Sequence, residues 1–383
     1  MRIAGLPRVL GRSLLLAACI TTNALSQPQT VPRLRDRALD KASYVALANQ
    51  WREYIEKNGE TADALVNLGM AQRYSGELEA ARRAGKRAVE LEPDNPRALV
   101  FYADRLMIDG GTDEAVKLLE RCRTIAPDYG EALTELAALH LRTGELDKAT
   151  ATLKTAFDRR IISRPLQDYA YNMLIGLPAG AVLITNGDND TFPPLALQAG
   201  MKFRNDVVVI NWHLLRLPEY ADALRRKHEY LKSAGQSKPG TATEDPGALI
   251  AQWIKDSKVP LYIAATVSRD RVEELGLKTK PVIEGLSLRA AGKGLTPEEA
   301  ARLVLEQYRL DSATDWDFAW DLVPALSNMM TNYVASMTDL AQQDGIPADL
   351  KCRLLGRAAA IAEFHHLNTE AHVKALLKKC EAK

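Results

Sequence analysis

Residues 182–194 read VLITNGDNDTFPP and join an apolar run, a polar loop with two acids, and a Thr-Phe-Pro-Pro segment. The apolar run, which begins at residue 181 and ends at 185, predicts a buried strand, and the last segment predicts the first turn of a helix. In α/β domains, ligands are usually held by loops at the carboxyl ends of strands. This loop is therefore the first place to look for a functional site.

Strand and helix signals alternate around this loop. Further strands are predicted where β-branched and apolar residues cluster, at 206–212 (DVVVINW), 261–266 and 282–289. Helices are predicted at 165–175, 191–203, 217–231 and 246–256, with a helical turn at 269–275 and a loop rich in Gly, Ser and Thr at 233–245. Such alternation is typical of a three-layer α/β domain with a mostly parallel sheet, which we place at 164–295.

Before this domain the sequence repeats itself with a period of 34 residues. Three consecutive blocks align at 62–95, 96–129 and 130–163. Small residues recur where two helices must approach closely, namely at Gly69, Ala103 and Ala137. The pattern resembles the tetratricopeptide family, which implies a helical solenoid. The amphipathic segment 38–57 is expected to cap the solenoid, so that the array covers 38–163.

Solenoids of this kind hold peptides or a neighbouring domain on the concave face. Ten side chains are expected there: Asp63, Val66, Met70, Arg73, Arg97, Val100, Asp104, Met107, Glu131 and Thr134. The Lys and Asn pattern with which family members clamp a terminal carboxylate is absent from the sequence, because Val66 and Met70 occupy two of its places. Two interpretations stay open: a protein partner bound by the array, or a purely structural role for these side chains.

The last part of the chain, 296–383, returns to helical periodicity. Helices are predicted at 327–343, 348–364 and 369–379, and they are expected to pack as degenerate helical hairpins against the α/β domain. Cys122 falls on a core position of the repeats, whereas Cys352 and Cys380 are the only pair close enough in sequence to suggest a disulfide. The alternative is that all three thiols are unpaired.

The first 26 residues combine a basic start, an apolar run at 13–20 and small residues before Gln27. They predict a secretory signal cleaved before Gln27, and hence an exported protein of the bacterial periplasm. A second interpretation is a lipoprotein signal, in which Cys19 of the sequence LAAC is lipidated and becomes the first residue.

Composition and charge exclude several classes of protein. The 383 residues are 46% apolar and 26% charged, which is ordinary for a folded, soluble chain of two or three domains. The formal charge of +1 becomes −2 when the three arginines of the signal are removed. No basic stripe with interleaved aromatics indicates a nucleic-acid partner. After the signal, no run approaches the ~18 apolar residues of a membrane span.

The loop sequence NGDNDTFP, followed by DVVVINWHLL, VPLYIAATV and KPVIEGLSLRA, resembles a specific family. It is the soluble C-terminal region of bacterial multi-pass membrane proteins related to protein O-mannosyltransferases. The resemblance covers roughly 179–364. The motif positions are here Asn186, Gly187, Asp188, Asn189, Asp190, Thr191, Phe192 and Pro193. Transferase chemistry in that family belongs to the membrane half, so the resemblance implies the fold and the position of the loop, without an activity.

The loop could bind a cation or a sugar. Asp188 and Asp190, with carbonyl oxygens from Asn186 and Asn189, would supply part of a divalent-cation site such as one for Ca²⁺. The spacing is not that of an EF-hand, because Ala199 stands where a bidentate Glu would be needed. A structural alternative is also open: Asp190 or Thr191 caps the helix, and Asp188 bonds the loop backbone.

Two further residues are expected near the loop. If the second strand is parallel to the first, Trp212 and His213 at its end approach the acids. An aromatic ring beside carboxylates is a common sugar-binding arrangement, and His213 could act as an acid or a base. Equally, Trp212 could be a core residue and His213 a packing residue.

The sequence thus favours an exported interaction or scaffold protein of the cell envelope that binds a protein partner, with a glycan or glycosylated partner at the α/β domain. The alternative is an enzyme acting on saccharides, with Asp188 and Asp190 as metal ligands or acid and base, assisted by His213. A nucleophile elbow and a Gly-rich phosphate loop are missing from the sequence, which weighs against the enzyme.

Overall fold

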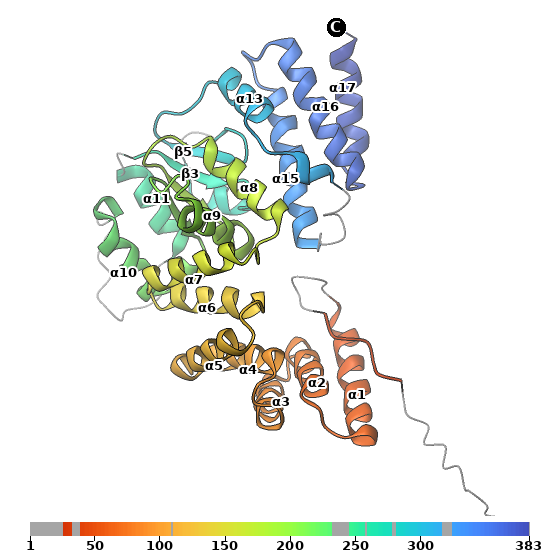
Figure 1. Cartoon of the computed structure of the whole chain (residues 1–383). Helices are drawn as coiled ribbons and strands as arrows, with labels where there is room; N and C mark the ends of the chain where they lie inside the picture. Colours follow the sequence, from red (N-terminus) through yellow and green to blue (C-terminus); the bar gives the residue numbers. More distant parts are fainter. Residues whose placement is uncertain are drawn as a thin grey trace, which may run out of the picture.

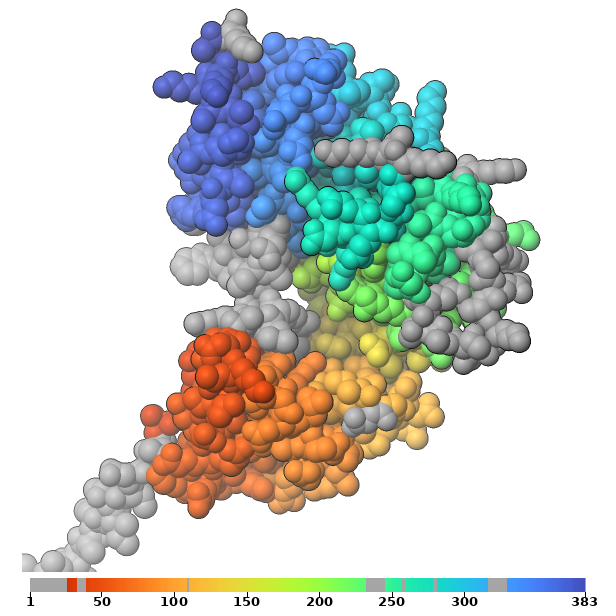
Figure 2. All heavy atoms as spheres, turned by 180° about the vertical axis from the view of Figure 1, so that it is seen from behind, coloured from red at the N-terminus to blue at the C-terminus, as the bar shows by residue number. Residues whose placement is uncertain are grey.

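The computed structural model describes residues 26–32, 39–108, 110–231, 245–256, 259–277, 281–315 and 324–382. The predicted signal up to residue 25, including Cys19, and the predicted loop up to residue 244 lie outside these residues. The repeats form one end of the molecule, the sheet lies in the middle, and the C-terminal helices form the other end (Figure 1 and Figure 2).

Seven helices build the N-terminal array. A capping helix is followed by three helical hairpins: α1 (Lys41–Asn58), α2 (Ala62–Ser75), α3 (Leu78–Leu91), α4 (Pro96–Ile108), α5 (Thr112–Ile125), α6 (Gly130–Arg142) and α7 (Leu146–Asp158). Each hairpin falls inside one predicted block of 34 residues. Gly76, Gly110 and Gly144 between the paired helices adopt positive φ, which glycine tolerates without strain. The predicted solenoid is confirmed.

Small residues bring the helices of the array together. Gly69 of α2 lies so close to the ring of Phe101 in α4 that an added Cβ would come within 2.6 Å of it. Cys122 of α5 is fully buried and carries a free thiol, as its core position predicts. Burial raises the pKa of the Cys122 thiol to about 11, so it stays protonated and unreactive at neutral pH.

Five strands follow the array in one mixed sheet. They are β1 (Val182–Thr185), β2 (Val208–Asn211), β3 (Leu261–Ala264), β4 (Val282–Ile283) and β5 (Ser287–Ala291), in the order β2-β1-β3-β5-β4. Strands β2, β1 and β3 are parallel, as predicted, whereas β5 runs antiparallel to β3 and to β4. The single strand predicted at 282–289 is therefore wrong: Gly285, at a φ of 76°, turns the chain and makes a hairpin.

Both faces of the sheet are buried, which gives three layers. Val182 and Ile184 belong to one core cluster with Trp253, and Leu183 belongs to the other with Tyr333. This alternation follows from the two-residue period of a strand. The helices that connect and cover the strands are α8 (Arg164–Ile175), α9 (Asp188–Met201), α10 (Pro218–Lys227), α11 (Pro246–Asp256), α12 (Arg269–Glu274) and α13 (Pro297–Glu306).

Three long helices close the C-terminal end: α15 (Pro324–Ala341), α16 (Ala348–Phe364) and α17 (Glu370–Glu381). Cys352 of α16 and Cys380 of α17 form a disulfide with a Cα–Cα distance of 5.6 Å. The alternative of three unpaired thiols is therefore wrong for this pair. In the described part of the chain, none of the helices is long and apolar enough to cross a bilayer.

The last repeat belongs to the array and to the α/β core at the same time. Ala137 of α6 and Leu153 of α7 lie in the same buried cluster as Ile184 of β1. Across the same junction, Lys227 of α10 forms an ion pair with Asp147 of α7 at 2.9 Å. The repeats therefore end against the sheet and share a core with it.

Candidate functional site

The acidic loop after β1 folds into a helix start. Helix α9 begins at Asp188, three residues earlier than predicted, with Gly187 as its N-cap. The Asp190 carboxylate accepts hydrogen bonds from the backbone N–H groups of Asn186 and Gly187, both at 2.7 Å, and from the hydroxyl of Thr266. Asp190 thus caps the helix from its third position, where its oxygens satisfy backbone N–H groups that the helix leaves unpaired. Neither Asp190 nor Thr191 is the N-cap.

Asp190 is also the most deeply buried acid of the loop, with 3% of its surface exposed. Burial raises its pKa, against the opposing effect of the hydrogen bonds from Thr266, Asn186 and Gly187. Both oxygens are already engaged. A cation at Asp190 would have to displace these three donors, whose loss from a buried group costs about 1–3 kcal/mol each.

Thr191 is enclosed in a polar network between strands. Its hydroxyl lies 2.7 Å from that of Thr185 in β1 and accepts a hydrogen bond from the Asn211 amide of β2 at 3.0 Å. The Tyr220 hydroxyl then accepts the Asn211 backbone N–H at 3.1 Å. All four side chains are buried. Such fully paired networks fix the strand ends relative to one another.

The loop surface contains a cationic group that the sequence interpretation missed. Arg271 of α12 donates to the Asn186 side-chain oxygen at 2.7 Å and contacts the His213 Nε2 atom at 3.0 Å. Because a guanidinium can only donate, this nitrogen of His213 accepts and the ring is neutral. Burial, with the nearby charges of Arg271 and Arg216, lowers the His213 pKa. Among the described residues, no carboxylate forms an ion pair with Arg271.

The remaining predicted residues separate into two groups. Trp212 is buried in the core, with 3% of its surface exposed, and offers no ring to a ligand. Asp188 is exposed and Asn189 is half-buried on the first turn of α9. Within the described ranges, no group of three or more His, Cys, Asp and Glu residues is arranged to hold a metal ion. The residues that the fold does bring together are Asn186, His213 and Arg271.

A cavity of about 1040 Å³ begins at the end of β3, beside this cluster. Its walls come from the β3–α12 connection, the β4–β5 hairpin and α15. Thr266, the partner of Asp190, lines it together with Ser268, Leu288, Asn332 and Gln343. Thr266 therefore connects the wall of this cavity with the start of α9. The nearest sequence signal is the Ser-Arg-Asp-Arg segment at 268–271, which indicates a charged turn but does not reveal which residues Arg271 contacts.

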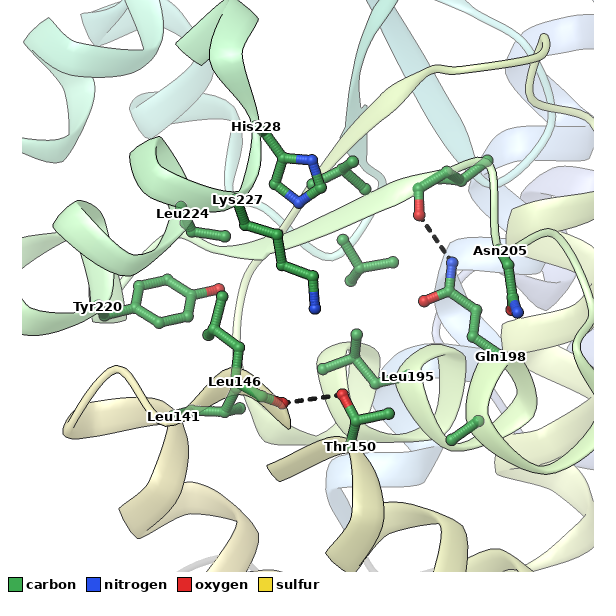
Figure 3. A pocket seen from close by; sticks show the side chains of 14 residues that line it. Leu141, Leu146, Thr150, Leu195, Gln198, Asn205, Tyr220, Leu224, Lys227 and His228 are labelled. Atoms are coloured by element: carbon green, nitrogen blue, oxygen red, sulfur yellow. Dashed lines mark hydrogen bonds between the residues drawn. The ribbon is translucent and has the colours of Figure 1, made fainter. Parts of the chain in front are cut away.

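A second cavity of about 270 Å³ lies along the free edge of β2 (Figure 3). Leu141 and Leu146 of the last repeat, Leu195 of α9 and Leu224 of α10 make it largely apolar. Lys227 reaches into it from α10, but its amino group is paired with Asp147. This cavity marks the junction of the array with the sheet.

Comparison with known families gives matches within residues 62–237. Tetratricopeptide repeat models match residues 62–95 and 106–160, and the first of these ranges is the first predicted block. A model described as TMEM260-associated domain 2 matches residues 166–237, which include β1, the acidic loop and β2. No curated protein sequence matches the chain. The chain therefore carries tetratricopeptide repeats in its N-terminal array, followed by a region similar to a TMEM260-associated domain.

Several solved structures are similar in part. MamA is 16% identical, with a TM-score of 0.31 over 50% of this chain and 93% of its own. A tetratricopeptide repeat protein from Parabacteroides merdae is 14% identical, with a TM-score of 0.32 over 83% and 93%. Naa15/Naa10 bound to HypK-THB is 17% identical, with a TM-score of 0.33 over 89% of this chain and 47% of that one. At such TM-scores these similarities carry no functional argument.

Proposed function

We propose that this chain is an exported scaffold protein of the cell envelope that holds a protein partner on its repeat array. The observation that carries the proposal is the polar side of helices α2 and α4. There Arg73 pairs with Asp104 of the next repeat, and Arg97 pairs with Asp63 of the previous one at 3.4 Å. These side chains remain partly exposed, so charged groups of a partner can form ion pairs with them.

Two observations support the cellular location. The first 26 residues have the composition of a secretory signal, with Cys19 as the alternative lipidation site. The disulfide between Cys352 and Cys380 is of the kind that forms and persists in oxidising compartments. Both favour the periplasm. The NGDNDTFP motif further relates the α/β region, by resemblance, to proteins linked with O-mannosyltransferases.

Site-specific photocrosslinking in cells tests the scaffold. A photoreactive residue at Met107 or Thr134, both on the predicted concave side, should capture the same partner band. The matched control is Lys117, an exposed residue on the outer helix of the same repeat as Met107. Equal bands from Met107 and Lys117, or no band from either concave position, would count against the proposal.

A second candidate function rests on the cluster of Asn186, His213 and Arg271. Its guanidinium is oriented by two neutral acceptors and forms no ion pair within the described ranges, which suits an oxygen-rich ligand such as a saccharide, neutral or carrying a carboxylate. The enzyme alternative is weaker, because Asp190 is committed to the helix start. A site for a divalent cation at Asp188 and Asp190 is disfavoured for the same reason.

A thermal-shift screen with neutral sugars, uronic acids and divalent cations separates these ligands. A saccharide at the cluster should raise the melting temperature of the native chain and lose its effect in Arg271→Gln. Arg269→Gln, two residues away on the same helix and largely exposed, is the control that should keep the shift. A shift with Ca²⁺ alone that disappears in Asp188→Asn would instead support the cation site.

A further inference from the structure

Residues 26–32, SQPQTVP, lie against the N-terminal end of the array although they precede its first helix. Val31 is buried, with 2% of its surface exposed, and belongs to the same core cluster as Val66 and Met70 of α2. Both of these residues were expected on an open concave face. Both are buried instead, as is Val100 of α4, which was also expected there, and the chain's own N-terminal segment shares the cluster of Val66 and Met70.

The repeats recognise the backbone of this segment. The Val31 N–H donates to the side-chain oxygen of Asn67 in α2 at 3.1 Å. Two residues earlier, the carbonyl oxygen of Gln29 accepts from the indole N–H of Trp51 in α1, also at 3.1 Å. A donor and an acceptor two residues apart lie on the same edge of an extended chain. This is the way in which main-chain hydrogen bonds hold an extended peptide in a groove.

Asn67 is oriented for this task. Its amide nitrogen donates to the Asp63 carbonyl at 2.9 Å, which fixes the side chain so that its oxygen faces Val31. The same oxygen accepts from Arg97 of the next repeat at 2.9 Å. Asn67 is 1% exposed and Trp51 is 0% exposed. Both recognition groups are therefore held in place by the array, whichever chain supplies the peptide.

Recognition depends on one side chain. Val31 is the only residue of the segment that is fully buried, whereas Gln29 and Thr30 are exposed and Pro28 and Pro32 are half-buried. A proline after Val31 favours an extended backbone at that residue, which lowers the entropy lost on docking. The position accepts a small β-branched residue and no charge, because a carboxylate there would be buried without a partner.

We propose that residues 27–32 are an intramolecular ligand of the array: they occupy a binding site for an extended peptide, the seat, formed by Trp51, Val66, Asn67 and Met70, and a partner segment that replaces them carries a small β-branched residue at the place of Val31. The inference rests on the proposed scaffold function and specifies its partner. The tether 33–40 makes docking intramolecular, so a partner peptide competes against a high effective concentration. Binding at this seat is thereby restrained until a partner supplies further contacts along the array.

The test uses the full chain without its signal and a fluorescein-labelled peptide of sequence QPQTVP, which corresponds to residues 27–32. Val31→Asp should vacate the seat, and the peptide should then bind saturably, with an affinity about tenfold or more above that for the unmodified chain. Thr30→Asp, at the exposed neighbouring residue, is the control that should leave the seat occupied and the peptide unbound. A peptide with Asp in place of its Val should bind to none of the chains.

Hydrogen exchange makes the result decisive. The amide of Val31 should be protected in the native chain and in Thr30→Asp, and unprotected in Val31→Asp, while circular dichroism stays unchanged. A vacated seat that does not bind the peptide, or a native chain that binds it as tightly as Val31→Asp, overturns the proposal. These outcomes are independent of the crosslinking at Met107 and Thr134, which judges the scaffold function away from this seat.

Discussion

The hydroxyl of Thr266, just beyond β3, donates a hydrogen bond to the carboxylate of Asp190 in the first turn of α9. This contact joins the ends of β1 and β3, which are neighbours in the sheet although β2 lies between them in the chain. The chain leaves β1 toward β2 on one side and reaches β3 on the other, so the contact crosses the point where ligands bind in open α/β sheets. In this protein the Thr266–Asp190 hydrogen bond spans that point.

Replacing Asp190 should destabilise the fold more than replacing the other acid of the loop. Asp190→Ala leaves two backbone N–H groups and the Thr266 hydroxyl without their acceptor, so the free energy of unfolding should fall by about 2–4 kcal/mol. Asp188→Asn, at an exposed residue, should change it by less than about 0.5 kcal/mol. Urea denaturation measures both. Equal effects of the two substitutions would show that Asp190 is not the residue that holds the helix start.

Because His213 is neutral in the folded chain, the stability of the fold should depend on pH. Its pKa is lowered in the folded chain, so its contribution to stability is present above the unfolded value of about 6.5 and is lost as pH falls through the lower folded value. Protonation would place a second positive charge beside Arg271. The stability difference between the native chain and His213→Gln should therefore shrink from pH about 7.5 to about 5. An NMR titration that places this pKa at or above 6.5 contradicts the expectation.

Reduction of the disulfide should weaken the C-terminal helices. Cys352 and Cys380 are 28 residues apart, and a loop of this length corresponds to about 3–4 kcal/mol in the chain-entropy model. The melting temperature of the native chain should thus fall when a reductant is added. The double variant Cys352→Ser/Cys380→Ser serves as the control, since it should already melt low and should not respond to the reductant.

Adding a side chain at two glycines should change the stability of the fold in opposite directions. Gly69→Val drives its Cβ into the ring of Phe101 and should cost about 1–3 kcal/mol of stability. Gly356, within α16, has open space where a Cβ would stand, so Gly356→Ala should stabilise the helix by about 0.5–1 kcal/mol. Thermal unfolding of the two variants checks the pair. A neutral Gly69→Val would mean that α2 and α4 can move apart.

The repeats could be predicted from the sequence because their packing is local. Gly69, Ala103 and Ala137 recur at one position, and each hairpin buries its small residues against its neighbours. The capping of α9 by Asp190 could be predicted only in part. Its role as a cap is a local property, but its partner Thr266 is 76 residues away, and sequence spacing does not reveal such a contact.

Other features depended wholly on tertiary structure. Arg271 belongs to a charged turn that the sequence does not distinguish from others. It becomes part of a candidate site because the parallel strands bring Asn186 and His213 beside it. Val31 lies before the first helix, where neither periodicity nor a repeat position indicates burial. Gly285 splits a run of apolar residues that reads as one strand, because a positive φ is not visible in the residue pattern.

The shared core of the last repeat and the sheet has a consequence for how the array can change its length. Ala137 and Leu153 belong to the same core cluster as Ile184, and α7 packs on α9, so removal of the third hairpin would expose part of the α/β core. The first two hairpins make their main contacts with neighbouring repeats, the capping helix and the docked N-terminal segment, which is the condition under which repeats can be inserted or deleted. Evolution or design can therefore lengthen this protein by inserting helical hairpins between the second and the third, while the junction of the third hairpin with the α/β domain stays unchanged.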